Sequence, residues 1–200
     1  ILNSSYKEQK LPSFWKYADV TPLPKVKQVI DPKKELRPIS LTASLSKVAE
    51  DFVVSDYIRP ALERIADSNQ FGTVSGSSTV LALLSMIHEW LLATDGNSAS
   101  VRVFLFDYRK AFDFIDHGTL AAKLKEVEVP NSIVNWILDF LSDRSQRVKL
   151  SRDCLSEWGA VPAGVPQGTK LGPWLFLLMI NDLVTPSALF GMWKYVDDTT

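Results

Sequence analysis

Three aspartates carry the clearest chemical signal in the sequence: Asp107 and the adjacent pair Asp197 and Asp198. Short, largely apolar runs precede them, at residues 101–106 and 190–193. An isolated Asp-Asp pair is usually a solvated turn, because neighbouring carboxylates repel each other when buried. Strands that deliver all three acids to one end of a sheet would instead form an oxygen-rich site for Mg²⁺, which takes its other ligands from water and phosphates. That arrangement is typical of two-metal phosphoryl transfer, with ions about 3.5–4 Å apart.

The elements that would hold these acids are strands at both points, with helices between them. Residues 101–106 predict a strand, because they are nearly continuous in apolar side chains. Residues 44–66 and 80–91 predict two helices, each with an apolar stripe that faces the core. The stripe residues are Leu45, Val48, Ala49 and Phe52 in the first helix, and Val80, Leu83, Leu84, Ile87 and Leu91 in the second.

Further local signals predict caps, loops and one edge strand. Asp116 is expected to cap a helix at its N-terminus, whereas Asp113 is not expected to bind metal. Residues 163–168 form a loop with glycine and proline that opens an apolar helix at 171–183. Residues 15–25 predict a strand with two prolines, which favour an edge strand or an extended arm over a central strand. A basic hairpin turn is expected after it.

Five motifs occur in a fixed order along the chain, and together they carry a family resemblance. They are Trp-Lys-Tyr-Ala-Asp-Val at 15–20, Arg-Pro-Ile-Ser-Leu-Thr at 37–42, Phe-Asp with Lys-Ala-Phe-Asp at 106–113, Gly-Val-Pro-Gln-Gly at 164–168 and Tyr-Val-Asp-Asp at 195–198. Each motif alone is weak, whereas five in this order and spacing are specific. The chain resembles the reverse transcriptases of non-LTR retrotransposons over nearly all of its length.

The resemblance implies a deoxynucleotide site beside the three acids. Arg37 and Lys25 match residues that hold the triphosphate, for which a guanidinium offers a bidentate fork and an ammonium a point charge. Phe112 matches an aromatic gate beneath the sugar that leaves no room for a 2′-hydroxyl. Gln167 and Gly168 match residues that touch the nucleotide and the templating base. Without the resemblance, Lys25 would be a solvated lysine and Phe112 a core residue.

The implied fold is the α/β (α+β) right-hand polymerase fold, with an antiparallel palm sheet that carries the three aspartates and with the thumb absent. Fingers are expected at residues 1–95 and 117–168, and the palm at 96–116 and 169–200. The chain begins with Ile1 and stops two residues after the acidic pair, so it is expected to be cut at both ends. A thumb, with an endonuclease domain as a further option, is expected in a longer protein.

The implied activity is RNA-directed DNA synthesis, in which a primer 3′-hydroxyl attacks the α-phosphate of a dNTP. Asp107, Asp197 and Asp198 would be the catalytic residues and the ligands of two Mg²⁺ ions, with Mn²⁺ as an alternative. The partners would be an RNA template, a DNA primer and dNTPs. The fragment alone is expected to be a poor enzyme, because an unpaired strand edge beside exposed apolar surface favours aggregation.

Three other functions fit parts of the pattern. An RNA-dependent RNA polymerase would normally carry Gly before the Asp-Asp pair and a polar residue in place of Phe112. A group II intron reverse transcriptase would differ in its flanking domains. An inactive, truncated element product would retain residual nucleic-acid binding or none, although all three acids are intact here.

Composition sets outer limits on these functions. The net charge of −1 argues against a general nucleic-acid binder, but residues 1–50 hold nine basic and five acidic side chains. The single cysteine, Cys154, excludes an internal disulfide and a cysteine-based zinc site. The longest apolar run, residues 174–180, is too short to span a bilayer, so no membrane association is expected.

Overall fold

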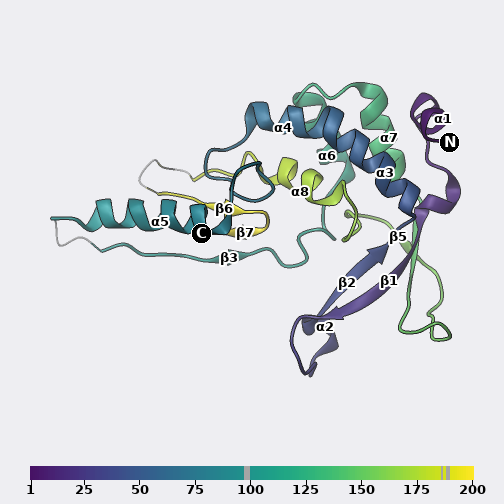
Figure 1. Cartoon of the computed structure of the whole chain (residues 1–200), viewed down its shortest axis with the longest axis horizontal. Coiled ribbons are helices and arrows are strands. Elements are labelled where there is room, and N and C mark those ends of the chain that lie inside the picture. Colours follow the sequence, from purple (N-terminus) through teal and green to yellow (C-terminus); the bar gives the residue numbers. More distant parts are fainter. Residues whose placement is uncertain (97–99, 186, 188–189) are drawn as a thin grey trace.

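The computed structural model describes residues 1–96, 100–185, 187 and 190–200, and it combines α-helices with two small β-sheets (Figure 1). The strands are β1 (Tyr17–Pro24), β2 (Leu36–Leu41), β3 (Phe106–Asp107), β4 (Arg144–Val148), β5 (Gly159–Val161), β6 (Lys194–Tyr195) and β7 (Asp198–Thr199). The α-helices are α1 (Leu2–Glu8), α2 (Pro32–Glu35), α3 (Ser44–Val53), α4 (Arg59–Ile65), α5 (Thr79–Thr94), α6 (His117–Glu126), α7 (Asn131–Leu141) and α8 (Gly172–Ile180). A 3₁₀ turn (Ser13–Lys16) precedes β1, and a π-helical segment (Val54–Ile58) joins α3 to α4.

The larger sheet has the strand order β2-β1-β4-β5. Strand β1 therefore lies inside the sheet, and the prediction of an edge strand is wrong. It pairs with β2 antiparallel from Asp19 to Pro24 and with β4 in parallel only from Tyr17 to Val20. The two prolines are tolerated because they lie beyond the residues that pair with β4. The predicted basic turn at 26–36 does join β1 to β2, as the tip of a hairpin.

The smaller sheet has the strand order β3-β7-β6, and all its pairs are antiparallel. The predicted strand over residues 101–106 is largely wrong, because only Phe106 of that run lies in β3. A strand needs a partner for its backbone groups, and β7 offers only Asp198 and Thr199. Residues 101–105 consequently run beside α5 as an exposed, irregular segment.

The core lies among α3, α4, α6, α7 and α8. Among its completely buried side chains are Trp15, Leu124, Trp136, Phe140 and Leu175. The helix predicted at 44–66 is present as α3, the π-helical segment and α4. Its predicted core stripe is wrong except at Ala49, because the helix is rotated so that Ser46, Glu50 and Val53 are buried instead.

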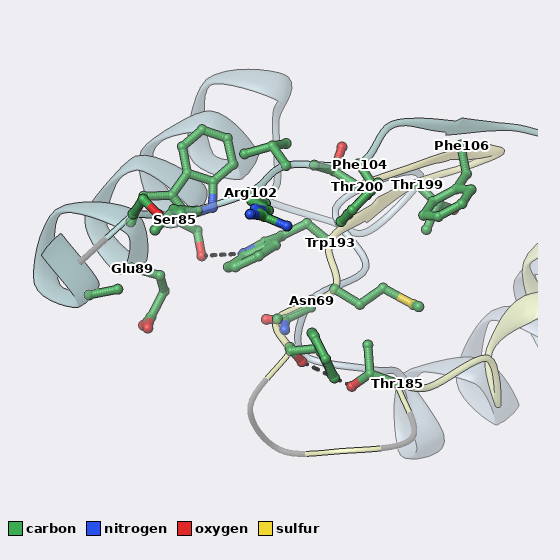
Figure 2. Close-up of a pocket in the computed structure, with 18 residues that line it drawn as sticks. Asn69, Ser85, Glu89, Arg102, Phe104, Phe106, Thr185, Trp193, Thr199 and Thr200 are labelled. Atoms are coloured by element: carbon green, nitrogen blue, oxygen red, sulfur yellow. Dashed lines mark hydrogen bonds between the residues drawn. The ribbon is translucent and has the colours of Figure 1, made fainter.

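Helix α5 extends away from this core, with residues 100–105 beside it (Figure 1). Its predicted core stripe is exposed, and Ala82 is the only residue of α5 described as buried. Contact with the small sheet comes through Trp193, whose indole nitrogen donates to Ser85 Oγ at 3.0 Å and whose ring meets Trp90 edge-on (Figure 2). Strands β6 and β7 form a second hairpin, the β6–β7 hairpin. A groove of about 1180 Å³ lies between α5, residues 100–106 and this hairpin.

In the part of the chain that is described, no helix has both the length and the apolar character that a membrane crossing requires.

Candidate active site

The three aspartates lie at one end of the small sheet. Asp107 of β3 is the register partner of Asp198 of β7, and Asp198 is in turn paired with Tyr195 of β6. Asp197 belongs to the tight turn between β6 and β7, where Val196 takes a positive φ of 58°. Backbone pairing therefore brings together the carboxylates of Asp107 and Asp198, which are 91 residues apart in the sequence.

Asp197 lies in an environment that disfavours the charged form of its carboxyl group. Burial raises the pKa of its carboxyl group, and the negative charges of Asp198 and Asp107 raise the pKa further. The positive charge of Arg37 acts in the opposite direction. Arg37 of the β1–β2 hairpin is therefore among the charges that act on the Asp197 carboxyl group.

The donors at this site suit a hard divalent cation, because carboxylate oxygens are what Mg²⁺ prefers. Their side chains do not converge, however. Across the described ranges, no three Asp, Glu, His or Cys side chains form a group that could hold a metal ion. The backbone places the acids together, and side-chain rotation would be needed to bring their oxygens around an ion.

The loop at residues 164–168 is fixed against the segment that follows Asp107. Val165 N donates to Phe112 O at 2.8 Å, and Gly164 N donates to Ile115 O at 3.1 Å. His117 holds the same loop through a 2.8 Å contact between its Nε2 and Gly164 O. Gly164 has a φ of +82°, and a Cβ there would lie 2.6 Å from Phe112 O. Only glycine fits this approach without displacing the backbone.

Phe112 is half-buried and packs on Phe176 of α8, with ring centroids 5.3 Å apart. Gln167 and Gly168 lie on the other side of the loop, against β2. Ser40 N donates to Gln167 O at 2.8 Å, and a Cβ at Gly168 would lie 3.0 Å from Ile39 Cγ2. The loop therefore connects the hairpin to the segment after Asp107.

The two basic residues predicted for the triphosphate occupy different positions on the hairpin. Arg37 is exposed on β2 opposite Leu23, within electrostatic reach of Asp197. Lys25 lies two residues further toward the tip, where its backbone N–H donates to Glu35 O at 2.8 Å. Lys25 therefore lies further toward the tip of the hairpin than Arg37 does.

Sequence reasoning missed the segment that supports the acidic turn. Gln70 is buried, and its Oε1 accepts from Gly72 N at 2.8 Å and from Val196 N at 3.2 Å. A Cβ at Gly72 would lie 2.3 Å from Val196 N, so glycine permits this close approach. A glycine such as Gly72 is a sequence signal for a special backbone position, but nothing local identifies its partner Val196, 124 residues away.

Comparison with known proteins adds sequence relatives. Residues 23–200 match the family described as reverse transcriptase (RNA-dependent DNA polymerase). The probable RNA-directed DNA polymerase from transposon BS of Drosophila melanogaster is 33% identical over 189 residues, which cover 94% of this chain and 20% of that protein. The corresponding protein from transposon X-element of the same organism is 31% identical over 193 residues, which cover 96% of this chain and 21% of that protein. The chain thus spans about a fifth of the length of these relatives.

Two solved telomerase structures are also similar in fold. The apo telomerase from Candida tropicalis, truncated from the C-terminal domain, aligns with a TM-score of 0.58 at 12% identity, covering 94% of this chain and 44% of that one. Telomerase from Candida albicans in complex with a TWJ fragment of telomeric RNA aligns with a TM-score of 0.56 at 15% identity. The alignment covers 98% of this chain and 39% of that one. The two structures support the predicted α/β polymerase fold of palm and fingers.

Proposed function

The chain belongs to the reverse transcriptase (RNA-dependent DNA polymerase) family, and we propose that it is the part of such an enzyme that adds deoxynucleotides to a primer on an RNA template. Membership confirms the resemblance seen in the five motifs. The observation that carries the proposal is the register pairing of Asp107 with Asp198 beside the half-buried carboxyl group of Asp197. Residues 1–95 and 117–168 would form the fingers, and 96–116 and 169–200 the palm.

Reverse transcriptases in general use divalent metal, and the donor set here suits two Mg²⁺ ions, or Mn²⁺. Asp107 and Asp197 would hold both ions, with Asp198 as a further ligand. When bound, the metal would lower the pKa of the primer 3′-hydroxyl and stabilise the charge that develops on the phosphates. The carboxylates themselves supply the negative potential that draws the ions to this end of the sheet.

The other residues would orient the nucleotide. Arg37 would bind the triphosphate through its bidentate guanidinium group, with Lys25 as an outer point charge on the same hairpin. The backbone at Gln167 and Gly168 would lie against the nucleotide and the templating base. Phe112, held by Phe176 beneath it, would present a rigid ring where a ribose 2′-hydroxyl would need space.

Primer extension with single-residue variants tests the proposal. Asp107→Asn and Asp197→Asn keep the shape of each side chain but remove a charge, so extension of a DNA primer on an RNA template should fall at least on the order of 10²–10³-fold. Asp113→Asn is the matched control, because Asp113 is exposed in the same segment as Asp107 and is not proposed as a ligand. Extension by Asp107→Asn at the wild-type rate would refute the assignment.

A second experiment tests the choice of sugar. Accommodating a 2′-hydroxyl against Phe112 should cost roughly 1–3 kcal/mol, as overpacking does, which is about tenfold to a hundredfold in selectivity. Phe112→Val should therefore raise kcat/KM for ribonucleotides relative to deoxynucleotides. An unchanged ratio with a lowered melting temperature would show that the ring contributes only to packing.

A further inference from the structure

We infer that Lys194 and Glu50, two buried charges at opposite ends of α8, are positioning residues that set the acidic turn and the nucleotide loop at a fixed spacing. The inference rests on the proposed function, because it assigns the two halves of that active site to the two ends of one helix. Neither residue belongs to a motif, and each is bonded to groups more than ten residues away in the sequence.

Lys194 holds the C-terminal end of α8. Its side chain is fully buried, which is rare for lysine unless the ammonium group is paired. The Nζ atom forms an ion pair with Asp67 Oδ2 at 2.7 Å. It also donates to three carbonyl oxygens at the end of the helix: Leu183 at 2.9 Å, and Ile180 and Asn181 at 3.3 Å each. A cation is favourable here because the last carbonyls of a helix are unpaired and carry partial negative charge.

Glu50 holds the N-terminal end of the same helix. It projects from α3 and is completely buried. Its Oε2 accepts from Lys170 N at 2.8 Å and from Leu171 N at 3.2 Å, and its Oε1 accepts from Ser46 Oγ at 3.0 Å. Burial raises the pKa of Glu50, while these hydrogen bonds favour its charged form. An anion at this end also complements the positive pole of the helix.

The two contacts connect α8 to different parts of the candidate site. Lys194 is three residues before Asp197 on the β6–β7 hairpin, so its bonds fix the position of the acidic turn relative to α8. Glu50 binds the backbone two and three residues after Gly168, so it fixes the loop that would face the nucleotide. Helix α8 between them is nine residues long, about 14 Å at 1.5 Å per residue. A rigid helix of this length keeps the proposed metal ligands and the proposed nucleotide contacts at a constant separation.

The chain offers a control for Lys194 at the same end of α8. Lys123 of α6 donates to Met179 O at 2.8 Å and also pairs with Asp182. It therefore binds the C-terminal turn of α8 as Lys194 does, but among the described residues it makes no hydrogen bond or ion pair with the acidic turn. A role limited to holding α8 would leave Mn²⁺ binding unchanged in both folded lysine variants, whereas a positioning role would weaken it only in Lys194→Met.

The experiment compares Lys194→Met, Lys123→Met and Glu50→Gln in the 200-residue chain, with Mn²⁺ binding measured by electron paramagnetic resonance. Lys194→Met should weaken Mn²⁺ binding about tenfold to a hundredfold, as the loss of groups that orient metal ligands does. Lys123→Met and Glu50→Gln should stay within about twofold of wild type, the small change expected of residues that do not orient the ligands. Circular dichroism confirms folding. If Lys194→Met is unfolded, Asp67→Asn replaces it, with a smaller loss expected in the same direction.

Primer extension then separates the two ends of the helix. Lys194→Met should lower kcat on the order of a hundredfold, as a small misplacement of reacting groups does, with little change in KM for the dNTP. Glu50→Gln should mainly raise KM. Two results, obtained while wild type extends the primer, would overturn the inference and leave the polymerase function standing. One is unchanged Mn²⁺ binding in Lys194→Met. The other is an equal loss of Mn²⁺ binding in both lysine variants.

The opposite failure is also distinguishable. If wild type binds Mn²⁺ but extends no primer, and Lys194→Met alone loses Mn²⁺ affinity, the positioning role stands, and the proposed activity fails for this 200-residue part of the enzyme. If the wild-type chain binds no Mn²⁺, both are overturned.

Discussion

Helices α8 and α5 contact the β6–β7 hairpin through two adjacent residues. The surroundings of the two helices differ completely. Lys194 is directed into the C-terminal end of α8, whereas Trp193 is directed toward α5. Most side chains of α8 are buried and both of its ends are held by charges. Helix α5 is also rich in apolar residues, yet in its described structure only Ala82 is buried. The comparison shows that apolar composition gives a helix the capacity for burial, and that its neighbours decide whether burial occurs.

The largest effect should come from shortening one leucine in each helix. Leu175 of α8 is completely buried and Leu84 of α5 is 57% exposed. Leu175→Ala should lower the free energy of unfolding by about 2–5 kcal/mol, because it leaves a cavity. Leu84→Ala should change it by less than about 0.5 kcal/mol. Urea denaturation followed by circular dichroism measures both, and equal losses would show that α5 is packed as tightly as α8.

A smaller difference should appear between two glycines with similar backbone angles. Gly164 has φ +82° beside the packed segment, whereas Gly76 has φ +77° in the loop before α5, where an added Cβ would meet nothing within 4 Å. In both Ala variants the new residue must adopt a left-handed backbone conformation, which lowers the free energy of unfolding by roughly 1–2 kcal/mol. Gly164→Ala should lose about 1–3 kcal/mol more, because its Cβ overlaps the backbone of residues 112 and 113. Matching losses in the two variants would mean that the loop yields freely.

The smallest effect concerns pH and tests whether the N-terminal end of α8 is closed to water. Burial raises the pKa of Glu50 above its ordinary value of 4.5, so the folded chain binds this proton more tightly than the unfolded chain. Stability from this group is present below about pH 4.5 and is lost as the pH rises through the folded-state pKa. The stability advantage of wild type over Glu50→Gln should therefore be larger at pH 4.5 than at pH 7.

Asp19 supplies the control for that measurement. The hydrogen bond from Arg147 holds the pKa of Asp19 below its ordinary value of 3.8, so its contribution is present above that value and is lost only as the pH falls through the lower folded-state pKa. The advantage of wild type over Asp19→Asn should stay nearly constant from pH 7 to pH 4.5. Parallel pH profiles for the two variants would contradict a buried Glu50.

Local signals allowed a good part of the fold to be predicted from the sequence. Asp116 caps α6 through Thr119 N at 2.7 Å, as its position before an apolar run indicates. The loop at 164–168 does precede the most apolar helix, because glycine and proline limit the backbone wherever they occur. The family and its fold also followed from motif order, and the comparisons confirm both.

What the sequence could not provide are contacts between distant residues. The exposed stripe of α5 and the irregular run at 101–105 were predicted as core and strand, because periodicity reports an apolar face and not its partner. Glu50 and Lys194 look like ordinary charges, since the groups that bury them are brought together only by the fold. The roles of the predicted site residues remain predictions, to be decided by the variants above.

The prolines of β1 have a consequence for self-association. Lys149 N donates to Val20 O at 2.9 Å, so the peptide groups of Val20 point toward β4. Alternate residues of a strand share one direction, which places Pro22 and Pro24 on that same side, beyond the last residue of β4. An open strand border normally offers N–H groups to which another chain can add. Here both positions lack an N–H group, so the projecting hairpin cannot extend its sheet into a neighbouring molecule along that border.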